Sequence, residues 1–225
     1  MTTPAQRRFE RATAAQAAEK ALPGESLAGS NAYELMLAKL YDDKRRLKEI
    51  QSVERKIEVK REILPDYDNW ISGVLSAGKG GQDDVLVTVM VWYLDVGNFD
   101  EALRIAAYVV QNGLTLPDQY QRNVGTVLVD EISDAALAVQ KAASDQAAVF
   151  PLQILQEVAT LTSGIDMPDQ ARAKLHKAMG YELRALGQLA EAKKQYETAL
   201  RLDEKSGVKR ILTELQADID KVSKA

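Results

Sequence analysis

The sequence contains no cysteine and a single histidine, His176. The absence of cysteine excludes disulfides, thiolate catalysis and Cys-ligated zinc sites. One histidine argues against a Ser-His-Asp triad or a His-rich metal site, and we interpret it as a packing or surface residue. No apolar run is long enough to span a membrane, and the N-terminus lacks the apolar stretch of a signal peptide. We therefore expect a soluble intracellular protein with no cofactor and no membrane partner.

Carboxylates are common, yet the sequence does not gather them into a site. Asp42-Asp43, Asp83-Asp84 and Asp130-Glu131 are adjacent pairs, and adjacent side chains on a helix diverge by about 100°. A two-metal nuclease site needs several carboxylates that converge on one point, whereas acidic residues at a helix start are explained by the helix dipole. We therefore predict no catalytic residue and no metal ligand.

Residues Gly73 to Gly80, GVLSAGKG, are close to the phosphate-binding loop G-x-x-x-x-G-K-[ST]. Gly80 stands where the magnesium-binding hydroxyl belongs, and no strand precedes the segment. We interpret it as a turn between two helices, from which Lys79 could still contact a phosphate.

Positive charge is concentrated at the N-terminal end. Residues 1–61 contain 13 Lys and Arg against 9 Asp and Glu, whereas residues 62–225 contain 16 against 24. This asymmetry predicts that a polyanion is met at the basic end, although a solvated helix face explains the same charges. Basic side chains can neutralise backbone phosphates but read no sequence unaided. The predicted DNA-binding residues are Arg7, Arg8, Arg11, Lys44, Arg45, Arg46, Lys48, Arg55 and Lys56.

Residues 1–31 are rich in Ala, Gln, Ser and Thr and include Pro4 and Pro23. Such a segment buries little apolar surface, so we predict a basic flexible arm with a fraying helix near residues 4–21. Ser30-Asn31 then offers an N-cap to one long charged helix over residues 32–64, which Pro65 ends. We assign DNA binding and oligomerisation to this helix.

Alternating steps of three and four residues along this helix give a mostly apolar stripe, typical of a coiled-coil seam. Asp43, Glu54 and Arg61 interrupt it, and polar seam residues can fix register or copy number. A helix of roughly 45 Å is too long for one small domain to cover. We predict that it packs on another copy or a partner, although it could also lie along the chain's own hairpins. The predicted oligomerisation residues are Tyr33, Met36, Leu40, Leu47, Ile50, Ile57 and Leu64.

The rest of the chain predicts an all-α fold, because no segment alternates as a β-strand would. In a central domain, residues 65–164, the apolar run Val85–Leu94 and the amphipathic segment after Gly97-Asn98 predict a helical hairpin. A second hairpin lies ninety positions later, in a C-terminal domain of residues 165–225. The small and aromatic packing positions of a tetratricopeptide repeat there match Gly180, Gly187, Ala192, Tyr196, Ala199 and Leu200.

Three stretches together resemble a known family: GKGGQDD with the helix after it (Gly78–Asp95), GLTLP (Gly113–Pro117) and DMPDQARAKLH (Asp166–His176). They are similar to the small terminase subunits of temperate contractile-tailed phages, often labelled the terminase endonuclease subunit. The resemblance implies a phage-encoded protein of the host cytoplasm that binds the packaging site on double-stranded phage DNA. It also implies a homo-oligomer, such as a ring, that recruits the large terminase subunit, which supplies ATP hydrolysis and in most systems the cut.

The endonuclease label does not agree with the residues. Because the sequence predicts no converging carboxylates and no nucleophile, we assign the label to the assembled terminase and predict that this chain is its DNA-recognition and assembly subunit. Two alternatives stay open. One is a metal-dependent endonuclease in its own right, and the other is a tetratricopeptide-type adaptor that binds protein and not DNA.

Overall fold

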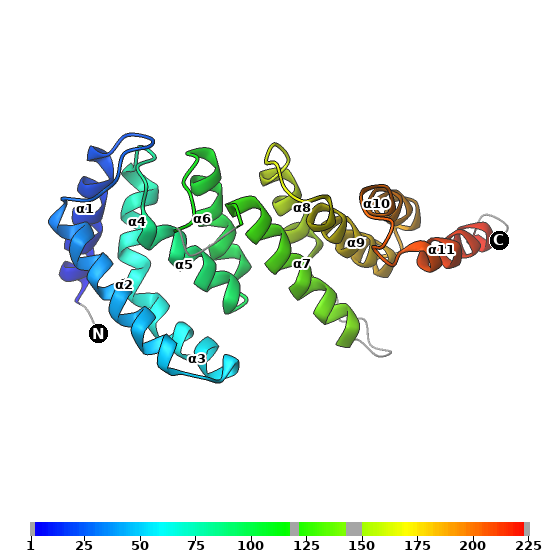
Figure 1. Ribbon diagram of the computed structural model, residues 1–225, viewed down its shortest axis with the longest axis horizontal. Helices are drawn as coiled ribbons and strands as arrows, with labels where there is room; N and C mark the ends of the chain where they lie inside the picture. Colours follow the sequence, from blue (N-terminus) through cyan, green and yellow to red (C-terminus); the bar gives the residue numbers. More distant parts are fainter. Residues whose placement is uncertain (1–2, 118–121, 143–149, 223–225) are drawn as a thin grey trace. The chain divides into compact units, whose positions relative to one another are not determined.

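Residues 3–117, 122–142 and 150–222 are described by the computed structural model, and they form α-helices joined by turns (Figure 1). Within these ranges no β-strand forms, and Ser26 and Gln82 meet only in an isolated parallel bridge. The all-α prediction is confirmed. None of the helices in these ranges is long and apolar enough to cross a membrane. The chain divides into two compact units, Met1–Arg122 and Asn123–Ala225.

The first unit is organised around α5 (Asp84–Asp95), in which every residue from Val85 to Leu94 is buried. Asp83 starts this helix, because its side chain accepts a hydrogen bond from the Leu86 N–H. The apolar run is therefore a buried helix, as predicted. The other elements of the unit are α1 (Pro4–Lys20), α2 (Asn31–Glu49), α3 (Val53–Ile63), the short 3-10 helix η1 (Leu64–Tyr67), α4 (Asp68–Ala77) and α6 (Phe99–Gln111).

α1 packs on α4 through small side chains. Ala14, Ala17 and Ala18 are buried, and a Cβ added to Gly73 would come within 2.6 Å of the Ala14 Cβ. This packing corrects the prediction of an arm that buries little, although a helix does form close to the expected residues 4–21. Alanine loses almost no side-chain entropy on burial, and small residues let two helix backbones approach closely, so an alanine-rich segment can dock without large apolar groups.

The long helix predicted over residues 32–64 is corrected to two helices, α2 and α3, which are joined by a tight turn (Figure 1). Ile50 has an extended backbone at the end of α2. Ser52 then accepts a hydrogen bond from the Arg55 N–H (3.2 Å) and starts α3. Because the chain turns back here, Val59 and Ile63 become buried in the first unit.

The apolar stripe along α2 and α3 mostly faces the chain itself. Its polar interruption Asp43 accepts hydrogen bonds from the Tyr67 hydroxyl (2.7 Å) and the Lys39 ammonium (2.8 Å). Most of the stripe therefore packs against other elements of the same chain, which was the alternative to packing on a second copy. Self-association through the stripe stays a prediction. The buried residues of the stripe are Tyr33, Leu40, Leu47 and Leu64. Its partly exposed residues are Met36, Ile50 and Ile57.

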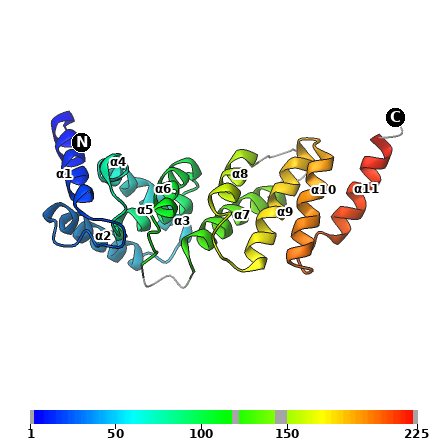
Figure 2. The same ribbon diagram turned by 90° about the horizontal axis from the view of Figure 1, so that it is seen from above.

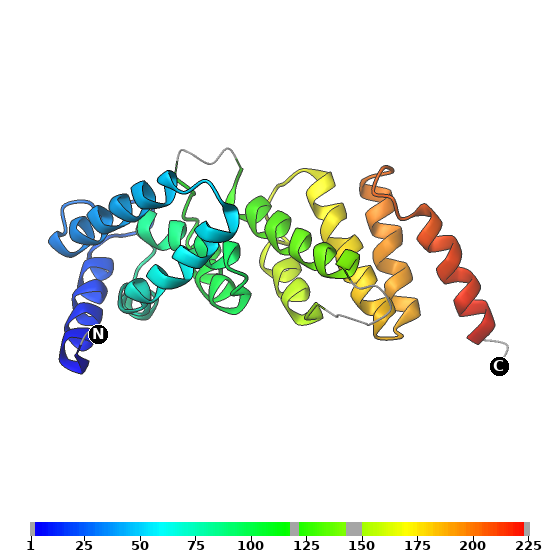
Figure 3. The same ribbon diagram turned by 90° about the horizontal axis from the view of Figure 1, so that it is seen from below.

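The second unit consists of α7 (Val124–Ala142), α8 (Leu152–Leu161), α9 (Asp169–Ala185), α10 (Leu189–Leu202) and α11 (Lys209–Val222). Both α7 and α8 pack on α9, and Figure 3 shows α9, α10 and α11 side by side. The most extensive contact between two helices of this unit is that of α9 with α10. Leu183, Tyr196 and Leu215, one from each of α9, α10 and α11, belong to one buried apolar cluster.

Both predicted hairpins, α5–α6 and α9–α10, are present and turn in the same way. Gly97 and Gly187 have φ angles of +77° and +73°, a left-handed conformation that favours glycine. In the second hairpin the Tyr196 ring lies directly beside Gly180, as a small and aromatic pair would. The tetratricopeptide likeness itself stays a prediction. The division between units falls at residues 122 and 123, whereas the sequence placed segment boundaries after residues 31, 64 and 164.

Candidate nucleic-acid interface

Three of the predicted DNA-binding residues, Arg7, Arg8 and Arg11, lie on α1 and are exposed. The helix starts with a neutral capping box. The Gln6 N–H donates to the Thr3 hydroxyl (3.2 Å), and the Thr3 N–H donates to the Gln6 side-chain oxygen (2.8 Å). The first turn contains no acidic residue. The start of α1 is therefore cationic, and the two acidic residues of the helix, Glu10 and Glu19, lie further along it.

The three predicted DNA-binding arginines of α2 and α3 lie beside carboxylates of the same two helices. Arg45 contacts Asp42 at 2.8 Å, and Arg46 contacts Glu62 at 3.2 Å across the turn. Arg55 contacts Glu58 at 2.7 Å and approaches the same Glu62 at 3.8 Å. The structure thus brings Arg46 and Arg55 together, but around a shared acidic residue.

The three lysines predicted to contact DNA differ from one another. Lys48 is exposed, whereas Lys44 and Lys56 are partly buried. Burial lowers the pKa of Lys44, and the nearby Asp84 carboxylate opposes that shift. The predicted DNA-binding residues therefore lie on two elements, α1 and the α2–α3 pair, which differ in how far their charge is neutralised.

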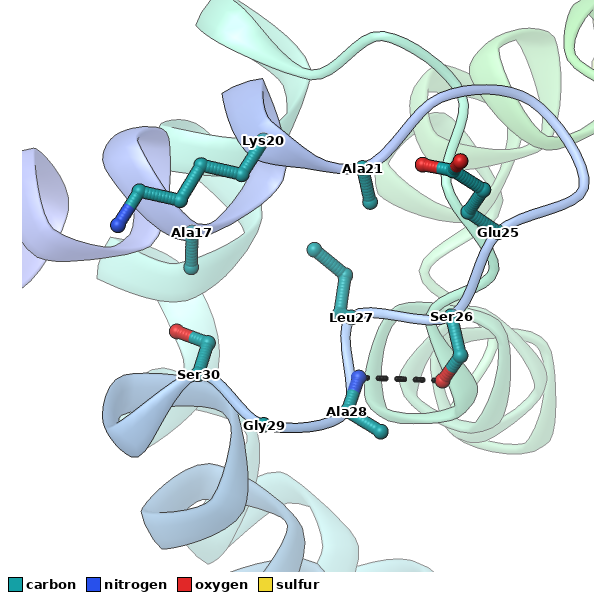
Figure 4. Close-up of a pocket in the computed structure, with 9 residues that line it drawn as sticks. All are labelled: Ala17, Lys20, Ala21, Glu25, Ser26, Leu27, Ala28, Gly29 and Ser30. Atoms are coloured by element: carbon teal, nitrogen blue, oxygen red, sulfur yellow. Dashed lines mark hydrogen bonds between the residues drawn. The ribbon is translucent and has the colours of Figure 1, made fainter.

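The loop between α1 and α2 borders a small cavity of about 280 Å³ (Figure 4). Its lining includes Ala17, Ala21, Leu27 and Ala28, and the Ser26 hydroxyl accepts a hydrogen bond from the Ala28 N–H (3.1 Å). Glu25 accepts a hydrogen bond from the Leu22 N–H (2.9 Å). Lys20 is exposed at one side. Lys20 therefore adds one exposed cation at the end of α1, beside this cavity.

The GKGGQDD segment forms a buried junction in the first unit. Asp83 is completely buried and accepts hydrogen bonds from the Trp70 indole N–H (2.8 Å) and the Leu86 N–H (2.9 Å). Burial raises the pKa of Asp83 to about 6, and the two hydrogen bonds limit the rise. The sequence places Asp83 at the start of the helix but does not indicate Trp70, because nothing in a local pattern specifies a partner thirteen residues away.

Gln82 joins the GKGGQDD segment to GLTLP. Its side-chain oxygen accepts a hydrogen bond from the Thr115 N–H (3.0 Å), and its amide nitrogen donates to the Thr115 carbonyl (2.9 Å). Nearby, the Gly80 N–H donates to the Tyr108 hydroxyl (2.9 Å). The segment is thus the predicted turn between helices. Lys79 remains exposed on it.

The DMPDQARAKLH segment has the same structural character in the second unit. Lys174 on α9 contacts Asp130 (2.9 Å) and Asp134 (3.0 Å) on α7, and Arg172 donates to the Ile165 carbonyl (2.8 Å). His176 shares a hydrogen bond of 2.7 Å with Gln195 on α10. These contacts tie neighbouring helices together and show His176 as a packing residue.

No group of three or more His, Asp or Glu side chains within the described ranges is arranged to hold a metal ion. The adjacent carboxylates of Asp83 and Asp84 have different partners. Asp83 accepts from Trp70, whereas Asp84 accepts from the Gln82 amide (2.9 Å). The divergence expected for neighbouring side chains on a helix is therefore present here.

Comparison with known proteins places the chain in a family. The sequence profile of the phage small terminase subunit family matches residues 37–170. The chain is 41% identical over 219 residues to the terminase, endonuclease subunit of Escherichia phage P2, which covers 97% of this chain and 86% of that protein. It is 25% identical over 103 residues to the probable terminase, endonuclease subunit of Haemophilus phage HP1 (strain HP1c1), covering 45% of this chain and 37% of that protein. No solved structure matches the chain. The resemblance seen in the three sequence stretches is confirmed, and the chain belongs to the phage small terminase subunit family.

Proposed function

We propose that this chain is the small subunit of a phage terminase that binds the packaging site on viral DNA. It assembles as a homo-oligomer, such as a ring, and recruits the large ATPase-nuclease subunit during genome packaging in the host cytoplasm. The observation that carries the proposal is the family match, together with the relative in Escherichia phage P2 that is similar over almost the whole chain.

Exposed cations on the first unit support DNA binding. Arg7, Arg8 and Arg11 on α1, and Lys48 on α2, are exposed to solvent. Such side chains neutralise phosphates and release counterions, so binding through them weakens steeply as salt rises. They supply affinity for a duplex but not the recognition of a particular packaging sequence.

Self-association is supported by apolar side chains that the chain itself leaves open. On α2, Leu35 is 74% exposed and Tyr41 is 61% exposed. Met36, Ile50 and Ile57 of the predicted oligomerisation stripe are only partly buried. A second copy of the chain could cover these groups and remove apolar surface from water. The large subunit needs a different surface, and the helical hairpins of the second unit, with Leu186 half exposed at the α9–α10 turn, are the surface we assign to it.

The names of the two relatives favour a second candidate, a metal-dependent endonuclease in its own right. Magnesium-dependent nicking of phage DNA by the purified chain, lost when a single carboxylate is replaced, would establish this activity. DNA binding without such nicking would leave the cut to the assembled terminase.

The test of the proposed function is binding of the purified full-length chain to duplex DNA that carries the phage packaging site. We expect binding whose log–log dependence on salt has a slope near −0.9 for each phosphate neutralised. Size-exclusion chromatography with light scattering, with and without this DNA, would report the copy number. A monomer that ignores DNA and binds a peptide or protein would favour the tetratricopeptide-type adaptor instead.

A further inference from the structure

We propose that the arginine face of α1, formed by Arg7, Arg8 and Arg11, makes the phosphate contacts to duplex DNA, and that the arginines of the α2–α3 pair do not. This inference rests on the proposed function, since it assumes that the chain binds DNA. It separates residues that the sequence alone groups together.

The three arginines lie close together on the helix. At 100° per residue, Arg7, Arg8 and Arg11 fall within an arc of about 100°, and Arg7 and Arg11 are one turn, about 6 Å, apart along the axis. All three are exposed. α1 lies at one end of the first unit in Figures 1 and 2.

Within the described parts of the chain, no carboxylate pairs with these three guanidinium groups. Two acidic side chains, Glu10 on α1 itself and Asp66 on η1, have other partners. Glu10 accepts a hydrogen bond from Asn69 (2.7 Å), and Asp66 contacts Lys39 (3.1 Å). The charge of the α1 face is therefore available to an anion.

On α2 and α3, by contrast, each of Arg45, Arg46 and Arg55 has a carboxylate at 2.7 to 3.2 Å. An exposed ion pair of this kind contributes little, about 0 to 1 kcal/mol, so a phosphate could displace it. The displaced carboxylate would nevertheless remain beside the phosphate and repel it. Each contact on this surface would thus bring an attraction and a repulsion together, whereas Glu10, the acidic residue beside Arg11 on α1, is bonded to Asn69 and not to an arginine.

The position of the arginines along α1 also points to a ligand. Cations near a helix N-terminus are unfavourable, because the macrodipole places positive charge there. Every other α-helix of the first unit has an acidic residue in its first turn, as the dipole favours, and α1 has none. The dipole slightly disfavours Arg7, which ends the first turn of α1, and a bound polyanion would reverse this unfavourable interaction.

α1 presents this face from a fixed position. The Glu10–Asn69 hydrogen bond and the close contact of Ala14 with Gly73 hold the helix on α4. A docked helix does not have to be ordered when DNA binds, which lowers the entropic cost of association compared with a free arm.

The test compares three full-length proteins for binding to duplex DNA that carries the packaging site. The α1 variant is Arg7→Gln/Arg8→Gln/Arg11→Gln, and its matched control is Arg45→Gln/Arg46→Gln/Arg55→Gln, which removes the same charge. Glutamine keeps nearly the helix propensity of arginine, and circular dichroism checks the fold of each variant.

We expect the α1 variant to reduce the magnitude of the log–log salt slope by about 2.7, from three phosphates at about 0.9 each, and the control to reduce it by less than about 1. Equal losses in both variants, or unchanged binding by the α1 variant, would overturn the inference. So would an α1 variant that keeps DNA binding but loses the large subunit, since the face would then meet a protein. Absence of DNA binding in the unmodified chain would instead refute the proposed function.

Discussion

The buried carboxyl of Asp83 makes a quantitative prediction about pH and stability. This group is completely buried, and burial raises its pKa from 3.8 to about 6 even though Trp70 and the Leu86 N–H both donate to it. The informative perturbation is Asp83→Asn, which removes the titration. Asparagine is as good an N-cap as aspartate, so the start of α5 is retained.

The sign follows from proton binding. Between the ordinary pKa of 3.8 and about 6, the folded chain holds a proton on Asp83 that the unfolded chain has released. Stability conferred by this group therefore falls as pH rises through that window. The full shift corresponds to about 3 kcal/mol, of which about 2 kcal/mol falls between about pH 4.5 and about pH 7.

The assay is urea denaturation of the unmodified chain and of Asp83→Asn across this pH range. A hydrogen bond lost in the variant changes its free energy of unfolding by the same amount at every pH. The other acidic groups titrate in both proteins, so their effects cancel when the two free energies are subtracted. We expect the free energy of unfolding of the unmodified chain, minus that of the variant, to decrease by about 2 kcal/mol from about pH 4.5 to about pH 7. A difference that is flat or increases with pH would refute the claim that burial outweighs the hydrogen bonds.

Three further predictions concern the stability of the fold. Gly73→Leu should destabilise the chain by about 2 kcal/mol and loosen α1, because its Cβ would lie 2.6 Å from that of Ala14, and urea denaturation with limited proteolysis of the α1–α2 loop checks both effects. Ser52→Ala should cost about 1 kcal/mol in urea denaturation, since it removes the acceptor of the Arg55 N–H at the start of α3, and an unchanged midpoint would contradict this role. Thr88→Val should raise the free energy of unfolding by about 1 kcal/mol in urea denaturation, because the Thr88 hydroxyl is buried without a hydrogen-bond partner among the described residues. A lower midpoint would indicate that this hydroxyl has a partner.

The helical hairpins could be predicted from the sequence because their signals are local. The apolar run of α5 is preceded by Asp83 and followed by Gly97, and the amphipathic period of α6 starts directly after it. A cap, a period and a positive-φ glycine all lie within one or two turns of the element that they define. A positive-φ glycine, Gly187, likewise separates α9 from α10.

The corrections at the N-terminus have the opposite cause. An alanine-rich segment has too little apolar surface to be recognised as core, and only the position of Gly73 on α4 shows what α1 packs against. The break between α2 and α3 contains no glycine or proline, so the heptad-like pattern runs through it. Ser52 is a cap signal, but its effect depends on the burial of Val59 and Ile63 after the chain has turned back.

The stretches that identify the family have structural roles for a related reason. Gln82 and Thr115 are thirty-three residues apart and form two hydrogen bonds with each other. Trp70 and Asp83 depend on each other in the same way. A sequence shows such residues as motifs but not as partners, so a motif that looks like a binding loop can be a packing junction. What remains on its surface is a single exposed lysine, Lys79.

The attraction of DNA to the proposed interface depends on where the charged side chains lie more than on how many there are. A cation and a carboxylate about 3 Å apart produce little net field beyond a Debye length of about 8 Å, because their contributions nearly cancel there. Three unpaired arginines on one helix face add instead of cancelling, and like charges that add can orient DNA before contact. The paired arginines Arg45, Arg46 and Arg55 therefore contribute little to the approach of DNA. On this argument the duplex first meets α1, and mutations there should lower the association rate more than mutations on α2 and α3.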